Sequence, residues 1–281
     1  MGRKIAIIGF TSSHQYAPWG QDGWELWICN NLHQFVPESW SRLYDLHDLE
    51  TIRSDKDHEA FLRRCEKPVV VWNAREEWPA SVAFPKDAAV ETFGRYFTNS
   101  ISWMTAHALM EMGSSAEEWA RGQVKALLED NPGLEPLEAV LFDSARNQYM
   151  SECELHIYGV DMAQGTEYAN QRPSCEYFLG LAAGMGVKIH VPPQSDLLKN
   201  TTLYGVEDDS FLRIKLDDRE KELVGRMNGL QEAFNQTQAQ ILQLQGALET
   251  TRYFKTVWTN PRAERDGSAK EAPAEALGLG A

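Results

Sequence analysis

Seven short apolar runs punctuate the first two thirds of this chain, and helical patterns separate several of them. Each run is rich in β-branched or aromatic residues and is bounded by Gly, Pro, Asn or Asp, which is typical of buried strands in a mainly parallel sheet. The pattern predicts an α/β fold, a Rossmann-like mainly parallel sheet with helices on both faces. The expected strands are residues 4–8, 24–29, 42–46, 69–72, 81–84, 155–158 and 187–191.

Helices between these strands are expected at about residues 57–66, 98–112 and 174–185. The second begins behind small polar residues that cap helices, and Gly113 is expected to end it. The third is expected to begin at Pro173 and Ser174 and to end among the glycines near residue 185.

Residues 114–151 carry two more helical patterns, which predict a helical hairpin inserted into the sheet domain. Ser114 and Ser115, followed by two glutamates, are expected to open its first helix, and Asn131-Pro132-Gly133 to break it. The second helix is expected at residues 134–149. The insertion could cover the rim of a site or a partner, or serve only as structure.

A heptad repeat begins at Leu223 and continues for four heptads. A stripe this narrow needs a partner helix to cover it, so the repeat predicts a coiled-coil helix and a homo-oligomer formed through residues 219–252. The alternative is that the stripe packs back on its own sheet domain or on the inserted hairpin. The stripe consists of Leu223, Met227, Leu230, Phe234, Thr237, Ile241, Leu244 and Leu248.

These patterns divide the chain into a nucleotide-binding domain at residues 1–205, a coiled-coil helix at 206–258 and a disordered Ala-, Glu-, Gly- and Pro-rich tail at 259–281. No stretch approaches the roughly 20 apolar residues of a membrane span, and the first apolar run is too short for a secretory signal, so we expect a cytoplasmic protein. The net charge of −14 argues against nonspecific nucleic-acid binding. The four cysteines lack metal-ligand spacing and are expected to be buried thiols.

The start of the predicted helix at 98–112 has the character of a phosphate site. Thr98, Asn99 and Ser100 add side-chain donors to the unpaired N–H groups of the first helical turn, where the helix dipole is positive.

The loops after the first two predicted strands offer further contacts. Gly9 permits a tight turn, and the hydroxyls of Ser12 and Ser13 follow it toward the same phosphates. Asn30 and Asn31 end the second strand with two amides, suited either to hydrogen-bonding a base or ribose or simply to forming a turn. The sequence contains neither G-x-G-x-x-G nor G-x-x-x-x-G-K-[ST], so it supports neither a standard dinucleotide enzyme nor a P-loop kinase.

Two candidate catalytic residues follow other predicted strands. Asp161, just beyond Gly159, could hold Mg²⁺ with the nucleotide phosphates, accept from a ribose hydroxyl or act as a base. His47 lies between Asp45 and Asp48, and a neighbouring carboxylate can tune its pKa and fix its tautomer. His14 is a weaker candidate for a phosphate contact, and the histidines at 33, 58, 107 and 156 are expected to be surface or core residues.

The order of these pieces resembles a known superfamily. A Gly-x-x-Ser-type loop, a strand ending Cys-Asn, the helix start Tyr-Phe-Thr-Asn-Ser and a strand ending Tyr-Gly-Val-Asp are similar to the bacterial lipooligosaccharide sialyltransferases. They are also similar to the archaeal hydroxymethyl-dihydropterin diphosphokinases and their uncharacterised phage and bacterial relatives. The resemblance covers roughly residues 4–200 and implies a site for CMP-sugar or another nucleotide. It implies that this site is lined by Gly9, Ser12, Asn30, Thr98, Asn99, Ser100, Gly159 and Asp161.

One departure from those sialyltransferases is the general base. The family places a histidine after the Gly-x-Asp strand, whereas residues 162–177 contain none and the next histidine, His190, lies in a predicted strand. The polar segment 163–172 instead predicts either a lid, with Tyr168 and Arg172 able to clamp a phosphate or stack on a base, or an ordinary surface loop.

The sequence therefore predicts a nucleotide-dependent transferase that moves a glycosyl or diphosphate group from a nucleotide or nucleotide-sugar donor. Two alternatives stay open. The first is a non-catalytic nucleotide-binding or sequestering module, because the predicted elements bind and none unmistakably reacts. The second is a structural assembly protein in which the coiled coil carries the function.

Overall fold

The computed structural model describes residues 2–162, 166–199 and 210–259, and the chain forms two compact units, Met1–Leu212 and Arg213–Ala281. The expected boundary at residues 205 and 206 lies outside the described residues. The strands are β1 (Lys4–Ile8), β2 (Trp24–Cys29), β3 (Arg42–Asp45), β4 (Val69–Val71), β5 (Ser81–Ala83), β6 (Glu154–Tyr158) and β7 (Lys188–His190). The α-helices are α1 (Leu49–Ser54), α2 (Lys56–Leu62), α3 (Lys86–Phe93), α4 (Ser100–Asp130), α5 (Glu138–Glu152), α6 (Thr166–Gly184) and α7 (Ser210–Thr259). The 3₁₀ turns are η1 (Ser12–Tyr16), η2 (Asn30–Gln34) and η3 (Pro132–Leu137).

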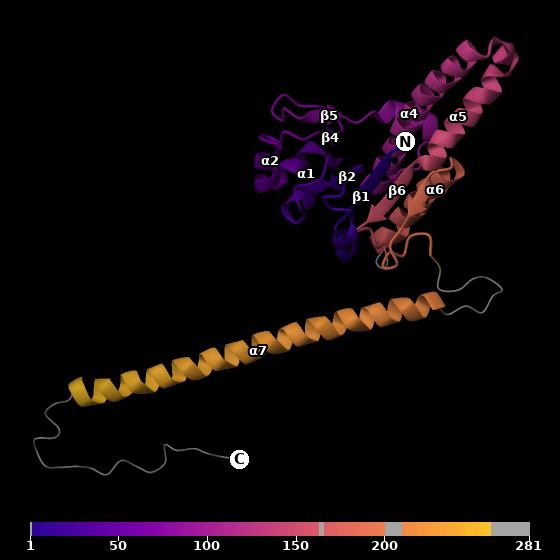
Figure 1. Cartoon of the computed structure of the whole chain (residues 1–281). Helices are drawn as coiled ribbons and strands as arrows, with labels where there is room; N and C mark the ends of the chain where they lie inside the picture. Colours follow the sequence, from indigo (N-terminus) through magenta and orange to yellow (C-terminus); the bar gives the residue numbers. More distant parts are fainter. Residues whose placement is uncertain (1, 163–165, 200–209, 260–281) are drawn as a thin grey trace, which may run out of the picture. The chain divides into compact units, whose positions relative to one another are not determined.

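The first unit contains one parallel sheet with the strand order β5-β4-β3-β2-β1-β6-β7 (Figure 1). The chain moves outward from β1 to β5 and then returns to the other side of β1, where β6 pairs in register with Ile8 opposite Tyr158. The order therefore reverses between β1 and β6, which is where open α/β sheets form their ligand-binding crevice. The predicted α/β class and all seven predicted strands are confirmed.

Side chains of alternate residues in β1 belong to two separate hydrophobic cores, one on each face of the sheet. Ile5 and Ile7 pack with the buried faces of α4 and α6, whereas Ala6 and Ile8 face a second core. Short elements supply that second core with Ala17, Trp40, Ile52, Leu62 and Trp78. Helices cover both faces of the sheet as predicted, but the longer helices of this unit, α4, α5 and α6, all pack on the face that carries Ile5 and Ile7.

The predicted helix end at Gly113 is wrong. α4 runs for 31 residues through Gly113, because its buried face continues at four-residue spacing through Met112, Ala116, Ala120 and Val124. A glycine in a helix interior costs about 1 kcal/mol, which packing against α5 can offset.

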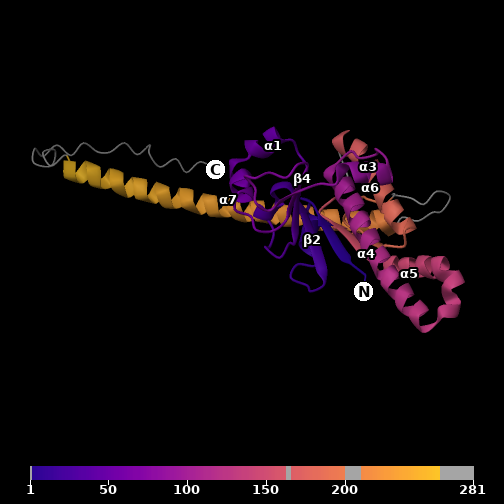
Figure 2. The same cartoon turned by 90° about the horizontal axis from the view of Figure 1, so that it is seen from above.

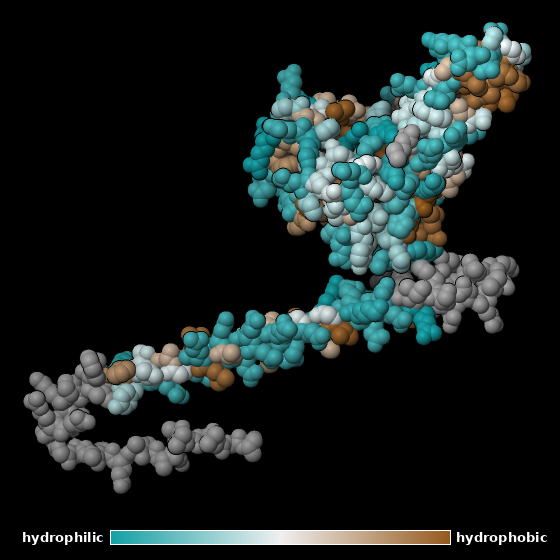
Figure 3. Space-filling model, in the orientation of Figure 1, coloured by the Kyte–Doolittle hydropathy of each residue, from teal (hydrophilic) through white to brown (hydrophobic). Residues whose placement is uncertain are grey.

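The inserted hairpin is present, but its first helix is the distal half of α4 rather than a separate helix (Figure 2). The break at Asn131 and Pro132 is confirmed. The second helix starts at Glu138 rather than at residue 134, because Pro132 and Pro136 place the preceding residues in η3. Figure 3 shows apolar side chains gathered at the tip of this hairpin, where Leu127, Leu137 and Val140 are exposed.

The predicted start of α6 at Pro173 is also wrong. The helix begins at Thr166 and contains Pro173 in its interior. Arg172 bonds to Glu176 four residues later, and the Ser174 hydroxyl donates to the Tyr96 carbonyl oxygen instead of capping a helix. Residues 166–172, expected as a lid or loop, are therefore helical, and residues 163–165 lie outside the described part of the chain.

All but the first three residues of α7, a single helix of 50 residues as the heptad pattern predicted, belong to the second unit. The apolar residues of its stripe are exposed, with Leu230 and Leu244 at 73% and 70%. The tail predicted at 259–281 lies, beyond Thr259, outside the described residues. Within the described ranges, no helix is both long and apolar enough to cross a membrane.

Candidate functional site

Two glycines bring the carboxyl ends of β1 and β6 into direct contact. Gly9 N donates to Tyr158 O at 2.8 Å, and Thr11 N donates to Gly159 O at 2.9 Å. A Cβ atom on Gly159 would lie 2.1 Å from Gly9 O, and the positive φ of +65° at Gly159 independently favours glycine. The buried Ser13 hydroxyl accepts from Gly159 N at 2.8 Å. This close contact between β1 and β6, the glycine crossing, thus depends on two residues without side chains, and the hydrogen bond to buried Ser13 stabilises it.

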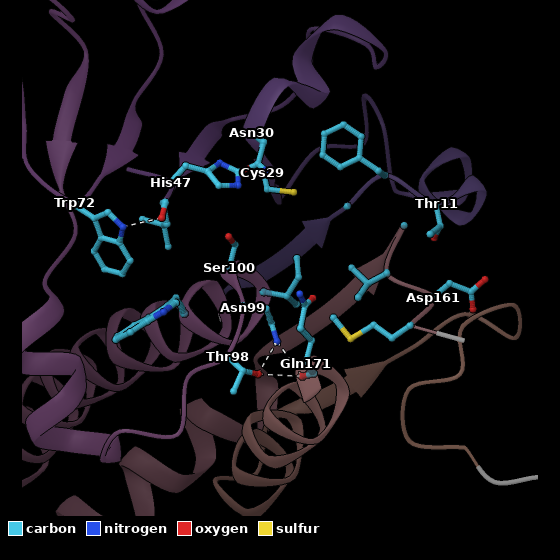
Figure 4. A pocket seen from close by; sticks show the side chains of 18 residues that line it. Thr11, Cys29, Asn30, His47, Trp72, Thr98, Asn99, Ser100, Asp161 and Gln171 are labelled. Carbon is cyan, nitrogen blue, oxygen red and sulfur yellow. Dashed lines mark hydrogen bonds between the residues drawn. The ribbon is translucent and has the colours of Figure 1, made fainter. Parts of the chain in front are cut away.

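A cavity of about 470 Å³ lies at this crossing (Figure 4). In this view Trp72 and His47 lie at one end, and Thr11 and Asp161 lie at the other. The lining residues are Gly9, Phe10, Thr11, Cys29, Asn30, Leu46, His47, Trp72, Thr98, Asn99, Ser100, Ile101, Trp103, Gly159, Val160, Asp161, Met162 and Gln171. Eight of the residues predicted from the sequence are therefore brought together here: Gly9, Asn30, His47, Thr98, Asn99, Ser100, Gly159 and Asp161.

The first turn of α4 faces this cavity, but two of its three predicted phosphate ligands have structural roles. Asn99 Oδ1 caps the helix by accepting from Ser102 N at 2.9 Å, and Asn99 Nδ2 donates to Gln171 O at 2.9 Å. The Thr98 hydroxyl is directed at the same carbonyl. Figure 4 shows the Ser100 hydroxyl directed into the cavity. Ser100 and the first backbone N–H groups of α4 are therefore the donors offered to a ligand.

Buried oxygen atoms on two lining side chains have no hydrogen-bond partner within the described chain. They are Asn30 Oδ1 and Thr11 Oγ1. Asn30 follows β2 in a left-handed backbone conformation with φ of 52°. Buried polar atoms are nearly always hydrogen-bonded, so a ligand with hydroxyl or amine donors would complete these two groups.

His47 is held at the cavity wall by a buried carboxylate. Its Nδ1 lies 2.8 Å from Asp45 Oδ1, and its backbone N–H donates to the same oxygen at 3.1 Å. Burial opposes ionisation of Asp45, but hydrogen bonds from His47 and His58 outweigh it and lower the pKa of Asp45 to about 2. The hydrogen bond to Asp45 in turn raises the pKa of His47. An ionised Asp45 can only accept, so neutral His47 carries its proton on Nδ1 and leaves Nε2 for a ligand.

Asp161 supplies a carboxylate at the opposite end of the cavity. Its backbone oxygen accepts from Asp196 N at 3.1 Å. Lys199 is close enough to interact with it electrostatically: burial lowers the pKa of Lys199, and Asp161 opposes that shift. The sequence patterns did not single out Lys199, because it approaches only through the fold. In the described ranges no three His, Cys, Asp or Glu residues gather to hold a metal.

Four predicted ligand residues do not line the cavity. Ser12 is exposed, Ser13 seals the glycine crossing, and Asn31 donates to Asp55 at 3.1 Å. Arg172 bonds to Glu176 and to the Lys199 carbonyl oxygen rather than reaching a ligand. The side chain of Tyr168, a fifth predicted ligand, lies outside the described part of the chain.

The sequence patterns missed an aromatic wall. Trp72 and Trp103 meet edge to face with ring centroids 5.2 Å apart, and Trp103 stacks on Phe97 at 3.6 Å. Trp72 Nε1 donates to Leu46 O at 2.6 Å, which fixes the indole. A signal existed for Trp72, because it directly follows β4 at the same edge of the sheet. Trp103 lies in the first turn of α4, and only its packing reveals its role.

No protein-family model, curated protein or solved structure matches this chain.

Proposed function

We propose that this protein is a nucleotide-dependent transferase whose donor, a nucleotide or nucleotide-sugar, binds in the cavity between β1 and β6. The observation that carries the proposal is the meeting of three kinds of group in one cavity. They are the first turn of α4, the buried acceptor Asn30 Oδ1 and the Nδ1-anchored His47. The cavity lies at the switch point of the sheet, where open α/β folds bind their ligands.

The phosphates belong at Gly9 and the start of α4. The helix dipole and the N–H groups of Ser100 and Ile101 favour a negative charge there. Gly9 lines the same cavity and allows β1 and β6 to approach each other there, because a Cβ on it would lie 2.5 Å from Gly159 O. Backbone N–H groups would serve as the anion site, since the described residues that line the cavity include no Lys or Arg.

The nucleoside belongs at Asn30 and the aromatic wall. Asn30 lies at the end of β2 about 20 residues after the first glycine turn, the position from which Rossmann-like sheets contact ribose. Its Oδ1 would accept a hydrogen bond from a ribose hydroxyl. Trp72 and Trp103 offer apolar ring surface for a base.

His47 supplies the general base. Its Nε2 takes the proton of an acceptor hydroxyl, whose oxygen then bonds to the transferred carbon or phosphorus. The bond to the departing phosphate oxygen breaks, and that oxygen keeps the electron pair. A Mg²⁺ ion would be held by Asp161 together with the donor phosphates, since Mg²⁺ commonly uses one or two carboxylates and substrate oxygens. The resemblance to sialyltransferases and pterin diphosphokinases supports either a glycosyl or a diphosphate group.

We also propose that α7 pairs with a second copy of this chain through residues 219–252. Its apolar stripe is exposed along the helix, and Gly225, Gly229 and Gly246 each weaken an isolated helix by about 1 kcal/mol. A partner helix would bury the stripe and offset that cost.

The test is a thermal-shift screen of the full chain with CMP, CMP-sugars, UDP-sugars, ATP and GTP, each with and without Mg²⁺, followed by turnover assays on the ligands that bind. Binding to the native state raises the apparent stability by mass action. Turnover of a donor supports the transferase. Tight binding without turnover would support a sequestering module instead, and no shift with any nucleotide would support an assembly protein.

A further inference from the structure

Asp45 joins His47, which lines the cavity, to two further histidines through hydrogen bonds. His58 on α2 places its Nε2 2.9 Å from Asp45 Oδ2, and its Nδ1 lies 2.9 Å from Nε2 of His33 on η2. Asp45 and His58 are buried, with 2% and 3% of their surface exposed. His33 is half-buried and stacks on Phe61 with ring centroids 3.7 Å apart. Four side chains from three segments thus form one hydrogen-bonded chain: Asp45 and His47 at the end of β3, His58 on α2 and His33 on η2.

Ionised Asp45 dictates the proton positions along this chain. It can only accept, so both His47 Nδ1 and His58 Nε2 must carry protons. When His58 is neutral, its Nδ1 is an acceptor and His33 donates through Nε2. A carboxylate with a proton donor on each oxygen cannot rotate without losing one of them, so His58 fixes the plane in which Asp45 holds His47.

We propose that His58 is a positioning residue for His47: through Asp45 it keeps His47 in the tautomer whose Nε2 is offered to the cavity, and His33 extends this control to the outer side of η2. This inference rests on the proposed function, because it assigns His47 the role of the base. It adds a dependence of that base on two groups that no ligand in the cavity would touch.

Each histidine of this hydrogen-bonded chain has charged or titratable neighbours. His47 faces Asp45 and Asp48. His58 faces Asp45, Asp55 and His33. His33 also faces Asp55 and Arg64, while burial and His58 lower its pKa to about 4. Buried Cys29 faces Asp45, and its pKa is raised to about 12, so it stays neutral.

The experiment is ¹⁵N-histidine NMR of the full chain across the pH range, with His47 assigned through His47→Gln. Neutral His47 should be the Nδ1–H tautomer. His58→Gln keeps an amide donor to Asp45, so His47 should keep its tautomer and its pKa. His58→Leu removes the donor, so Asp45 becomes more basic and the pKa of His47 should rise by at least about 0.5. His190→Gln, at an exposed histidine of β7 outside this chain of groups, should change nothing.

If neutral His47 in the unmodified protein carries its proton on Nε2, the proposal is overturned. This measurement uses the parent protein, so it does not depend on whether a variant folds. An identical His47 titration in the parent and in folded His58→Leu would also overturn it. The NMR result is independent of the transferase: the effect of His58→Leu on His47 can be measured in a protein that turns over no nucleotide. Where turnover is found, the acidic limb of its pH profile should move with the His47 pKa in His58→Leu, and turnover without that movement would refute this inference alone.

Discussion

Ser100 differs from its two neighbours at the start of α4 in where its side chain is directed. The neighbouring Thr98 and Asn99 are directed at the Gln171 carbonyl oxygen, and Asn99 also caps α4. Ser100 belongs to the same helix start, but its hydroxyl is directed into the cavity (Figure 4). A substitution at Ser100 can therefore change ligand binding without removing the cap.

Ser100→Asp should abolish nucleotide binding and leave the fold intact. An acid in the first turn of a helix is itself favourable, whereas it repels a phosphate at the same place. Thermal shift with the best nucleotide measures binding, and circular dichroism measures the fold. The matched control is Ser144→Asp on the exposed side of α5, which should bind like the parent. Unchanged affinity in folded Ser100→Asp would remove the phosphate from this site.

His47 and Asp161 lie at opposite ends of the cavity and should separate catalysis from binding. His47→Gln should reduce turnover with little effect on nucleotide affinity, because a base acts on the acceptor. Asp161→Asn keeps the size and removes the charge, so Mg²⁺-dependent binding or turnover should be lost. Steady-state kinetics and titration calorimetry with and without Mg²⁺ measure both. Wild-type activity in both variants would show that the assigned catalytic residues are wrong.

α4 is the element that positions the site, and charged groups at the opposite edge of the sheet hold it there. Glu111 binds Arg3 at 2.6 Å and Arg42 at 2.7 Å, next to the amino ends of β1 and β3. The eleven residue-to-residue steps from Ser100 to Glu111 span about 16 Å of helix. This matches the roughly 16 Å length of a five-residue strand. Anchoring Glu111 at one edge of the sheet therefore places the start of α4 at the other edge.

The contact between β1 and β6 should be intolerant of any side chain. Gly159→Ala would place a Cβ 2.1 Å from Gly9 O in a left-handed conformation. We expect a loss of about 3 kcal/mol or more in the free energy of unfolding. Gly180→Ala in α6 is the control, because its Cβ would meet no atom within 4 Å and should add up to about 1 kcal/mol. Urea denaturation measures both, and equal stability of the two variants would mean that β1 and β6 can move apart at little cost.

The two units of the molecule differ in how much of their apolar surface is buried. The first unit buries two cores around its sheet, whereas α7 exposes nearly its whole apolar stripe. The second copy of α7 proposed above would supply a covering surface for that stripe.

The double variant Leu230→Glu, Ile241→Glu should convert an oligomer into a folded monomer. Two carboxylates in the seam would be buried without partners, which costs several kcal/mol, more than four heptads easily absorb. Light scattering of the variant beside the parent measures the mass. Leu242→Glu, exposed but outside the stripe, should stay oligomeric. A parent that is already monomeric, or a double variant of unchanged mass, would show that the stripe is not the oligomer interface.

The sequence alone determined the sheet, most of the cavity edge and the long C-terminal helix. Strands, caps and heptads are set by short-range patterns that a few neighbouring residues complete. Residues just beyond β1, β2, β3 and β6 meet at one edge in any parallel sheet, so the sequence is enough to predict that Gly9, Asn30, His47 and Gly159 share one site.

The tertiary structure decided where helices continue and which polar groups are free for a ligand. α4 passes through Gly113 and α6 through Pro173 because buried contacts outweigh local preferences for breaks. Thr98 and Asn99 are engaged by Gln171, 72 residues along the chain from Asn99. Trp103 and the chain from Asp45 through His58 to His33 join segments that are distant in sequence, and such pairings leave no periodic signal. Local chemistry therefore predicts the edge on which a site lies, and only packing between distant segments selects the side chains that serve it.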